Sequence, residues 1–457
     1  MKKFYCLLVI FFSLNVYSQD PMIMKVNALG GINNVHIKLC ATGVSGGGSW
    51  SFPYTFVKTN NATVTGSGVA TLSPTEKIFF PEPGEYIFTL YPSANPHHLA
   101  FNFGNSQLTA GDRAKILEIQ QWGDMSWSQN ISRMFELCNN LTVTATDIPN
   151  FSAVTDMSYL FNGCSSISTV PNITLWQTAN VTNITGMFSG CSQFNQNISA
   201  MNIGMVTSFA GLFYGCSSFN QPLTWSTAGI TNMNSMFANA TSFNQNISSW
   251  NTSNLTDMSN MFSGASSFQQ NISNWDTSNV FNFSATFANA TSFNQNLTNW
   301  NLISSVNMTG MFYNAGLSCE NYTLTLKGWS EAAFTPSSIT LGATGQTYGS
   351  QGQVYRNFLT TTKNWTITGD IYNSSCLLST HEFVNKATNF IVYPNPSRTS
   401  FNLKTSLKGK AYLTDQVGNH VTTVDIKETQ TTVDVSGLAA GVYYITLGQA
   451  TAKVIIY

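Results

Sequence analysis

Charged side chains are scarce in this sequence of 457 residues. Only 9% of the residues are charged and the formal net charge is −1, whereas about a quarter is usual in globular domains. A chain this neutral offers no basic surface for nucleic acid or for an anionic membrane, so we expect no nucleic-acid partner. Asn, Ser and Thr take the place of the missing charges, and these side chains suit stacked β-structure with polar ladders.

Long apolar runs are also missing, except at the N-terminus. The segment Phe4–Leu14 is apolar, two lysines precede it, and the small residues Val16 and Ser18 follow it. This order is typical of a secretory signal peptide, and the segment is too short to span a membrane. We therefore predict a signal peptide at residues 1–18, export to the periplasm, and no transmembrane segment in the mature chain.

Residues that enzymes commonly use are few and scattered. The chain has five histidines, and the adjacent pair His97 and His98 has no carboxylate or cysteine at a spacing suited to a shared metal. No nucleophile elbow, P-loop or zinc-protease motif occurs, and no pair of carboxylates recurs. We predict that the protein is not an enzyme and holds neither a metal nor a cofactor.

The middle of the chain repeats itself about eight times. The copies align on one phenylalanine, which recurs every 24 to 27 residues. A fixed period in the twenties is typical of a leucine-rich-repeat-like solenoid, in which each copy stacks on the next. The aligned residues are Phe135, Phe161, Phe188, Phe213, Phe237, Phe262, Phe287 and Phe312.

Each copy divides into a predicted helix, a stop and a predicted strand. Met258 and Phe262 fall on one face of a short helix. Two residues after the aligned phenylalanine most copies have Gly or Asn, which tolerate the left-handed conformation that ends a helix. The first copy has Leu137 there, so we expect its helix to end differently. Phe268 and Ile272 then fall on one face of a short strand.

Two copies carry a family resemblance. The segments NMNSMFANATSFNQNISSWNTSN (232–254) and DMSNMFSGASSFQQNISNWDTSN (257–279) closely resemble the BspA-type leucine-rich repeat of bacterial surface proteins. The lead-in KILEIQQWGDMSW (115–127) is similar to that family's entry segment. Members are typically surface or secreted proteins, often implicated in adhesion to host or matrix proteins, so the resemblance implies binding. It also implies that residues 317–372 cap the last repeat, whose apolar end would otherwise be exposed.

The end of the chain resembles a second family. It contains YPNP at 393–396, then the spaced Phe401 and Leu403, and GLAAGVY at 437–443. In this order the motifs resemble the C-terminal sorting domain of the Bacteroidetes type IX secretion system. The resemblance implies that residues 390–457 contact the type IX secretion machinery. It also implies a protein that is secreted or held on the outer-membrane cell surface.

These patterns together predict the fold class and the domains. We expect an α+β fold, with a leucine-rich-repeat-like solenoid of about eight rungs, each a short strand plus a short helix, flanked by N- and C-terminal β-sandwich domains. The predicted boundaries are the signal peptide at 1–18, an N-terminal β-sandwich-like domain at 19–112, the solenoid at 113–316, its C-terminal cap at 317–372, a linker at 373–389 and the sorting domain, a β-sandwich, at 390–457.

Seven cysteines remain once Cys6 leaves with the signal peptide. Four occupy one repeat position where later copies have alanine, so we expect small, buried, free thiols there. These are Cys138, Cys164, Cys191 and Cys216. Cys319 and Cys376 flank the predicted cap and are a candidate disulfide in an exported protein, while Cys40 has no evident partner.

Two columns of the repeat could serve binding. Glutamines recur in one slot, where stacked amides can hydrogen-bond from rung to rung. Tryptophan ends four of the predicted strands, as Trp225, Trp250, Trp275 and Trp300. It either turns inward as a corner of the core or faces a groove beside polar residues. In the second case the candidate ligand-binding residues are Asn246, Ser248, Trp250, Asn271, Ser273, Trp275, Asn296, Thr298 and Trp300.

The sequence thus leads to three hypotheses for function. The first is a secreted or cell-surface, non-enzymatic binding or adhesion protein whose solenoid face contacts an extracellular protein or glycan through many weak contacts. The alternative is a structural stalk of the cell surface without a specific ligand. An enzyme acting on polysaccharide is disfavoured, because no repeat contains a unique cluster of acid, base and nucleophile.

Overall fold

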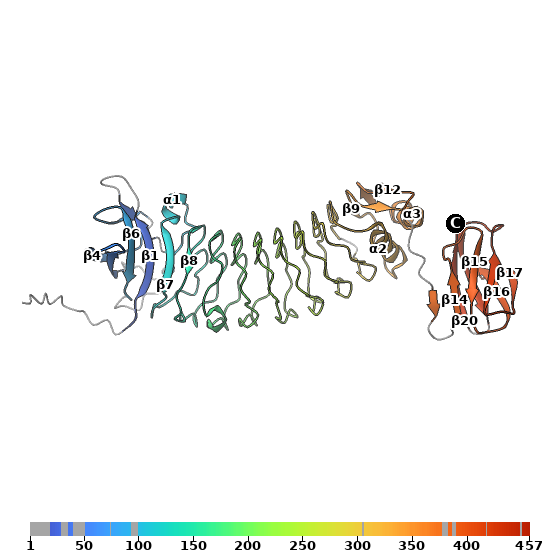
Figure 1. The fold of residues 1–457 in the computed structure, drawn as a ribbon, viewed down its shortest axis with the longest axis horizontal. Coiled ribbons are helices and arrows are strands. Elements are labelled where there is room, and N and C mark those ends of the chain that lie inside the picture. Colours follow the sequence, from blue (N-terminus) through green and yellow to red (C-terminus); the bar gives the residue numbers. More distant parts are fainter. Residues whose placement is uncertain are drawn as a thin grey trace, which may run out of the picture. The chain divides into compact units, whose positions relative to one another are not determined.

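The chain consists of two compact units, residues 1–376 and residues 377–457. The computed structural model describes residues 19–28, 35–39, 51–73, 75–92, 99–303, 306–376, 383–385, 390–416, 418–447 and 450–457 (Figure 1). The predicted signal peptide, Cys40 and most of the predicted linker lie outside these residues.

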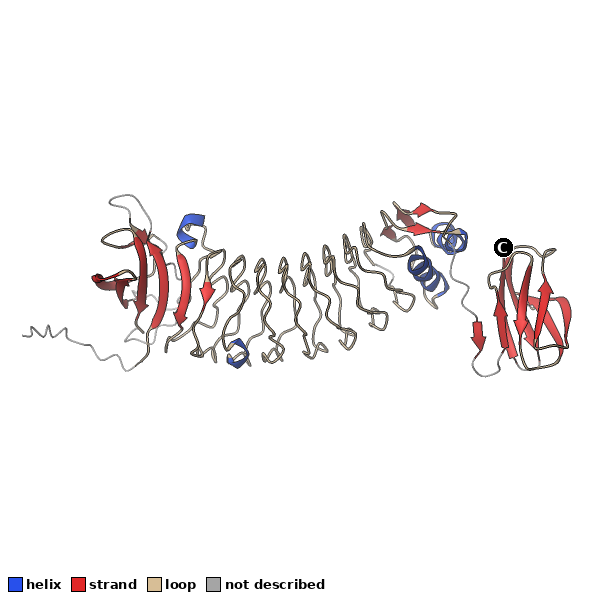
Figure 2. Ribbon diagram, in the orientation of Figure 1, coloured by secondary structure: helices blue, strands red, loops and turns tan. Residues whose placement is uncertain are grey.

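The first unit begins with a sheet that runs on into the repeats. Its strand order is β4-β3-β6-β1-β7-β8, while β2 and β5 form a separate pair (Figure 2). Among the described residues of this part the one helix is α1 (Ala110–Arg113), which begins with a capping box between Thr109 and Asp112. The strands are β1 (Met22–Ala28), β2 (His36–Ile37), β3 (Phe52–Lys58), β4 (Asn61–Ala70), β5 (Ile78–Phe79), β6 (Gly84–Leu90), β7 (Ile116–Gln121) and β8 (Thr142–Val143).

Strand β1 joins this sheet to the repeats. One edge of β1 pairs antiparallel with β6 and the other with β7, and β7 pairs in parallel with β8, which lies in the first repeat. One hydrophobic core accordingly extends from Met22 to Ile367. The separate N-terminal β-sandwich of the predicted fold class is therefore wrong, because the edge of the sheet is taken by the repeats themselves.

Residues 129–316 form what we call the repeat stack, a series of coils that each run from one aligned phenylalanine to the next (Figure 1). In the described part of the stack, the regular elements are β8 and the single 3-10 turn η1 (Ile173–Leu175). Outside β8, the β-type pairing between coils consists of isolated parallel bridges, such as the bridge between Asp257 and Asn282. The predicted α+β leucine-rich-repeat-like solenoid, with a strand and a helix in every rung, is therefore wrong.

In each coil, two residues whose backbone has a positive φ, the left-handed conformation, explain why no helix forms there. They lie two positions before and two positions after the aligned phenylalanine, as with Asn260 (φ 55°) and Gly264 (φ 71°) around Phe262. A helix needs consecutive right-handed residues, so it cannot pass through two left-handed ones only four positions apart. The second position is left-handed, as the Gly/Asn pattern predicted. The exception expected for Leu137 is wrong, because it has a φ of 62°.

Backbone hydrogen bonds in the stack alternate between the same coil and the next one. The N–H of Phe262 donates to the carbonyl oxygen of Thr286 in the following coil at 2.9 Å. The N–H of the next residue, Ser263, donates within its own coil to the carbonyl of Asn260 at 3.0 Å. In the segment around each aligned phenylalanine, every second N–H thus donates to the next coil, and these bonds replace the i to i−4 bonds that a helix would make there.

The core of the stack is built from columns of identical side chains. The eight aligned phenylalanines are all fully buried, and neighbouring rings stack with centroids 5.8–6.1 Å apart. A second column lies beside it, and within one coil the rings of Phe262 and Phe268 are 4.0 Å apart. Aromatic pairs in this geometry gain energy beyond the area they bury. The second column consists of Phe194, Phe219, Phe243, Phe268 and Phe293.

Replacing Gly264 with alanine is expected to lower the free energy of unfolding by about 1–2 kcal/mol. Gly264 has a φ of +71°, and a Cβ there would overlap the side-chain oxygen of Asn239 in the preceding coil. The matched control is Gly229→Ala, because Gly229 is exposed and a Cβ there would meet no atom within 4 Å. Urea denaturation measures both, and equal effects would contradict the argument.

The stack ends in a cap built from helices and two small parallel sheets. The side chain of Arg356 donates to the buried carboxylate of Asp370 from Nε at 2.8 Å and from Nη2 at 2.9 Å, and the hydroxyl of Tyr322 donates to the same carboxylate at 3.1 Å. This network ties the last turns together. The elements are α2 (Cys319–Glu331), β9 (Thr340–Gly342), β10 (Thr347–Tyr348), α3 (Ser350–Asn357), the π-helix η2 (Phe358–Thr362), β11 (Thr366–Thr368) and β12 (Ile371–Tyr372).

The second unit consists of two four-stranded sheets that share one core. Their strand orders are β13-β14-β15-β18 and β17-β16-β19-β20, and side chains such as Phe401 and Leu413 from the two sheets belong to a single buried cluster. The strands are β13 (Phe383–Asn385), β14 (Phe390–Tyr393), β15 (Ser400–Lys404), β16 (Gly409–Asp415), β17 (His420–Ile426), β18 (Gln430–Asp434), β19 (Gly441–Leu447) and β20 (Ala450–Ile456).

Candidate binding site

The tryptophans of the candidate ligand-binding face lie inside the stack. Trp250 is 5% exposed, Trp275 2% and Trp300 1%. Each indole N–H donates to a backbone carbonyl of the preceding coil at 3.1–3.2 Å, so the polar edge of each ring is satisfied as well. The groove-facing placement of these three residues is therefore wrong. They are inward corners of the core, because no strand continues far enough to turn them outward.

The polar residues of the same face remain at the surface, where they shape turns. The side-chain oxygen of Asn246 accepts from the N–H of Ser248 at 2.9 Å, and Asn271 accepts in the same way from Ser273 at 2.9 Å. Such turns, in which an Asn or Asp side chain bonds two residues ahead, are a common local motif. The Asn-x-Ser pattern thus has a structural role, and it leaves the amide nitrogen of each Asn available.

The glutamine column bonds between coils as the sequence predicted, although its side chains do not bond to one another. Nε2 of Gln270 donates to the carbonyl and to Oδ1 of Asn244 at 3.0 and 2.8 Å. Nε2 of Gln295 donates to the carbonyl of Gln269 at 2.8 Å. These bonds fix the side chains along one side of the stack.

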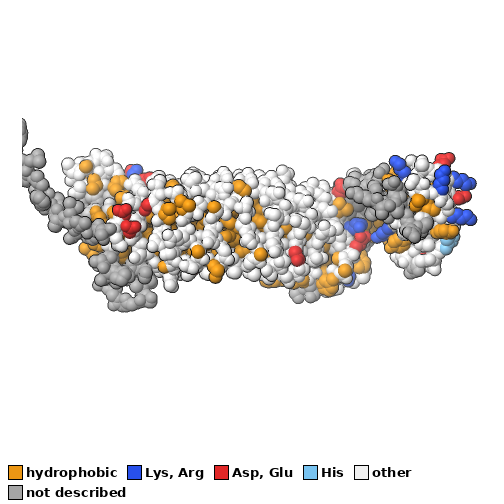
Figure 3. All heavy atoms as spheres, turned by 90° about the horizontal axis from the view of Figure 1, so that it is seen from below, with side chains coloured by type: hydrophobic (Ala, Val, Ile, Leu, Met, Phe, Trp, Pro, Cys, Tyr) orange, Lys and Arg blue, Asp and Glu red, His pale blue; other side chains and the backbone are white. Residues whose placement is uncertain are grey.

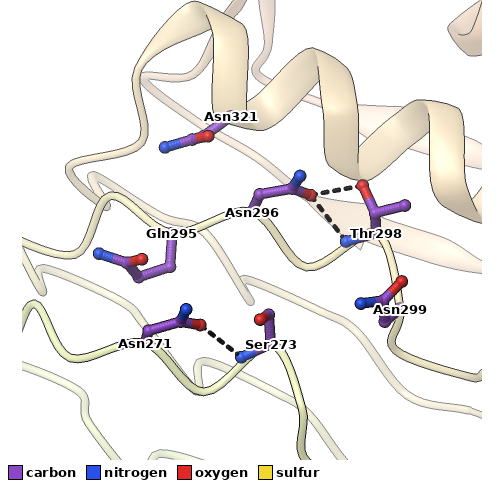
Figure 4. A pocket seen from close by; sticks show the side chains of 7 residues that line it. All are labelled: Asn271, Ser273, Gln295, Asn296, Thr298, Asn299 and Asn321. Atoms are coloured by element: carbon purple, nitrogen blue, oxygen red, sulfur yellow. Dashed lines mark hydrogen bonds between the residues drawn. The ribbon is translucent and has the colours of Figure 1, made fainter. Parts of the chain in front are cut away.

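A polar pocket of about 350 Å³ opens where this side of the stack meets helix α2 (Figure 4). Asn271 and Ser273 come from one coil, the next coil contributes a second group, and Asn321 comes from α2. No charged side chain is among the lining residues, and none of them is aromatic. The lining residues are Asn271, Ser273, Gln295, Asn296, Thr298, Asn299 and Asn321.

Helix α2 is held in place by bonds to the last coils. Its first turn is capped by Ser318, whose hydroxyl accepts from the N–H of Asn321 at 3.2 Å. Nδ2 of Asn321 donates to the carbonyl and to Oδ1 of Asn294 at 2.8 and 2.9 Å. The hydroxyl of Thr298 donates to the carbonyl of Leu324 at 2.8 Å. The wall that α2 adds to the pocket is therefore rigidly positioned.

Several polar atoms in the pocket have no hydrogen-bond partner within the described part of the chain. Nδ2 of Asn271 and Nδ2 of Asn296 are free to donate, because each residue uses its Oδ1 for the local turn. Oε1 of Gln295 and Oδ1 of Asn321 are free to accept, because each residue uses its nitrogen for an inter-coil bond. The pocket thus presents neutral donors and neutral acceptors side by side.

The sequence identified part of this pocket. Four of the nine candidate ligand-binding residues line it, and the polar pair Asn246 and Ser248 lies one coil away from it. Sequence reasoning missed Asn299 and Asn321, and it treated Gln295 only as part of a ladder. The repeat carried no signal for Asn321, because α2 follows the last coil and lies beyond the repeating pattern.

The cysteines of the first unit fall into two groups. Cys138, Cys164, Cys191 and Cys216 are buried and free, as the exchange with alanine predicted, and burial raises the pKa of each thiol. Neutral, inaccessible thiols are unreactive. Cys319 and Cys376, the candidate pair, form a disulfide with Cα atoms 6.0 Å apart, which ties the start of α2 to the end of the unit.

Comparison with known families gives two matches. Residues 129–224 and 223–325 match a family described as a Mycoplasma protein of unknown function, DUF285. Residues 391–456 match the secretion system C-terminal sorting domain. The chain matches none of the curated proteins and none of the solved structures. The repeat match agrees with the resemblance of the copies to a bacterial repeat family, and it carries no activity with it.

The sorting-domain match determines where the protein goes. Its C-terminal unit interacts with the type IX secretion machinery, and the protein is exported to the cell surface or the extracellular space. In the described residues, no helix is long and apolar enough to cross a membrane. The same residues contain no group of three His, Cys, Asp or Glu side chains placed to hold a metal ion.

Proposed function

We propose that this is a non-enzymatic binding protein of the cell surface or the extracellular space, in which the repeat stack is the scaffold and its polar side contacts an extracellular protein or glycan. The observation that carries the proposal is the pocket between the last coils and α2, with four polar atoms that lack partners in the described chain. These atoms lie on half-buried or exposed residues and face solvent, so a ligand with matching donors and acceptors could replace their water hydrogen bonds without disturbing the bonds that hold the stack together.

Two further points support binding over catalysis. The resemblance to BspA-type surface repeats points to adhesion. The seven residues of the pocket are amides and hydroxyls, and such groups do not exchange protons readily near neutral pH, so they offer no general acid or base. The pocket can therefore hold a ligand in place, but its lining has no group to activate one.

A stalk without a specific ligand is the second candidate function. It is favoured by how completely the repeat uses its own polar groups. For example, the hydroxyl of buried Thr277 donates to the carbonyl of Asn301 in the next coil at 2.8 Å, and Nδ2 of Asn274 donates to the carbonyl of Ser248 in the preceding coil at 2.9 Å. Such bonds stabilise the stack itself and need no partner.

Binding of the secreted full-length protein to arrays of glycans and matrix proteins distinguishes these functions. We expect saturable binding to at least one class of macromolecule, with weak single contacts that strengthen when the protein is displayed in many copies. Unfolded protein is the control and should not bind. If the folded protein binds nothing on either array, the binding proposal is wrong and the stalk without a specific ligand is the function that remains.

A further inference from the structure

We infer that the pocket between α2 and the last coils is a subsite for a neutral saccharide, an inference that rests on the proposed binding function and names the ligand class for that site. The ligand would be an uncharged, hydroxyl-rich sugar segment. It would lie between Asn271 and Asn296 on the floor and Asn321 on the wall, with the amide groups around it (Figure 4).

The hydrogen-bonding groups of the pocket match those of a sugar. Asn271 and Asn296 offer amide N–H donors, while Gln295 and Asn321 offer carbonyl acceptors. A hydroxyl donates one hydrogen bond and accepts two, so neighbouring hydroxyls on one sugar ring can satisfy both kinds of group at once. The two donors come from equivalent positions of adjacent coils, which sets them in the same orientation.

The absence of charge from the lining argues against an ionised ligand. Moving a carboxylate, phosphate or ammonium group out of water is costly unless an opposite charge or several hydrogen bonds replace the solvent. None of the seven lining residues carries a charge. Charged side chains are also sparse over the stack on the face seen in Figure 3, so no long-range attraction would draw a charged polymer there.

The same lining argues against a peptide that inserts an apolar side chain. Its exposed groups are amides and hydroxyls, and the nearby Trp275 and Trp300 are buried in the core. An apolar side chain would therefore gain little from entering. A pocket of about 350 Å³ is at the small end of ligand sites, and it suits a short sugar segment better than a folded protein surface.

Substitution by aspartate tests the pocket without disturbing the turn. In Asn271→Asp the remaining oxygen can still accept from Ser273, as Asp276 does from Ser278 at 2.9 Å in the same coil. The change removes the free N–H donor and places a negative charge in the pocket. Asn197→Asp makes the same change three coils before Asn271, outside the pocket and outside the candidate ligand-binding residues. It is the matched control, because Oδ1 of Asn197 also accepts from the N–H of Ser199 at 2.9 Å.

The experiment measures binding of neutral oligosaccharides (cellohexaose, mannohexaose and N-acetylchitohexaose) to the full-length protein by calorimetry and saturation-transfer NMR, with polygalacturonate and heparin as charged comparisons. We expect at least one neutral oligosaccharide to bind. Asn271→Asp and Asn296→Asp should each weaken that binding about tenfold or more, and Asn197→Asp should leave it unchanged. Thermal unfolding checks that all three variants fold.

Three results would overturn the inference. The first is no binding of any neutral oligosaccharide at millimolar concentration. The second is tighter binding of the charged polymers than of the neutral ones, and the third is an equal effect of Asn197→Asp and Asn271→Asp. If the full-length protein binds a matrix protein but no saccharide, the saccharide inference fails while the proposed binding function stands.

Discussion

Replacing Trp275 with alanine is expected to lower the free energy of unfolding by about 3–5 kcal/mol. The ring is 2% exposed and stacks on Trp250 with centroids 6.2 Å apart. Its indole N–H donates to the carbonyl of Ile247 at 3.2 Å. Alanine would leave a cavity in the column and remove one of the two hydrogen bonds that the Ile247 carbonyl accepts, since the N–H of Trp250 also donates to it at 3.1 Å. Urea denaturation followed by circular dichroism would measure the loss.

The matched variant Trp275→Phe separates the two contributions. Phenylalanine keeps a ring in the column but cannot donate the hydrogen bond, so we expect it to lose less stability than alanine does. An alanine variant as stable as the wild type would contradict the buried position. It would also support the alternative in which the tryptophans face outward as ligand-binding residues. In that case their replacement would reduce binding and leave the fold intact.

Deleting residues 390–457 is expected to abolish export across the outer membrane. The matched sorting domain occupies residues 391–456, so the shortened protein would lack the part that the type IX secretion machinery recognises. It should accumulate inside the cell envelope while the intact protein reaches the surface or the medium. Cell fractionation with immunoblotting would measure the distribution.

The control for this deletion is a full-length protein carrying Asn246→Asp, which alters the stack surface and leaves the sorting domain intact. It should be exported like the wild type. A point variant tests whether export depends on the folded sorting domain. The side chain of Asn395 holds the last strand, because its Nδ2 donates to the carbonyl of Lys453 at 2.6 Å and its Oδ1 accepts from the N–H of Ile455 at 2.8 Å. Asn395→Ala should loosen β20 and reduce export. Normal secretion of the deletion variant would contradict the assignment.

The lack of charge has a physical cause that becomes clear once the coils are stacked. Equivalent residues of successive coils form parallel bridges, and Asp257 lies between Asn232 and Asn282 in one such column. Adjacent parallel backbones lie only about 4.8 Å apart, so a charge at every copy would stack like charges on one another. Asparagine makes the same turn without that repulsion, and single aspartates are tolerated between neutral neighbours.

Part of the fold could be predicted from the repeating pattern. The period, the buried phenylalanine columns, the left-handed Gly or Asn after seven of the eight aligned phenylalanines and the free thiols all follow from residue type and spacing. The helix predicted in each repeat was wrong, because the spacing of Met258 and Phe262 suits a tight turn as well as one face of a helix. The signal for the turn lay two positions before the aligned phenylalanine, where the backbone has a positive φ in every copy. Three copies have glycine there, namely Gly186, Gly211 and Gly310, and glycine adopts a positive φ easily.

Only part of the candidate site was predictable from the sequence, because the pocket depends on contacts between segments as well as on the local pattern. Asn271 and Asn296 could be assigned to the surface because they alternate with buried residues. Their grouping with Asn321 depends on where α2 lies against the last coil, and Gly328 allows that close approach, since a Cβ there would overlap the backbone of Thr298. No local pattern encodes a contact between a helix and a coil that precedes it by about one repeat.

By itself, the sequence determined the repeat period, the residues of the core and the export of the protein, because each of these depends on the kind and spacing of side chains. The tertiary structure decided whether each repeat is a helix or a turn, which way the tryptophans face and where the pocket opens. Those outcomes depend on hydrogen bonds to neighbouring coils. Once a coil stacks, the carbonyls of the next coil accept from every second N–H around the aligned phenylalanine, and the local preference for a helix no longer decides the conformation there.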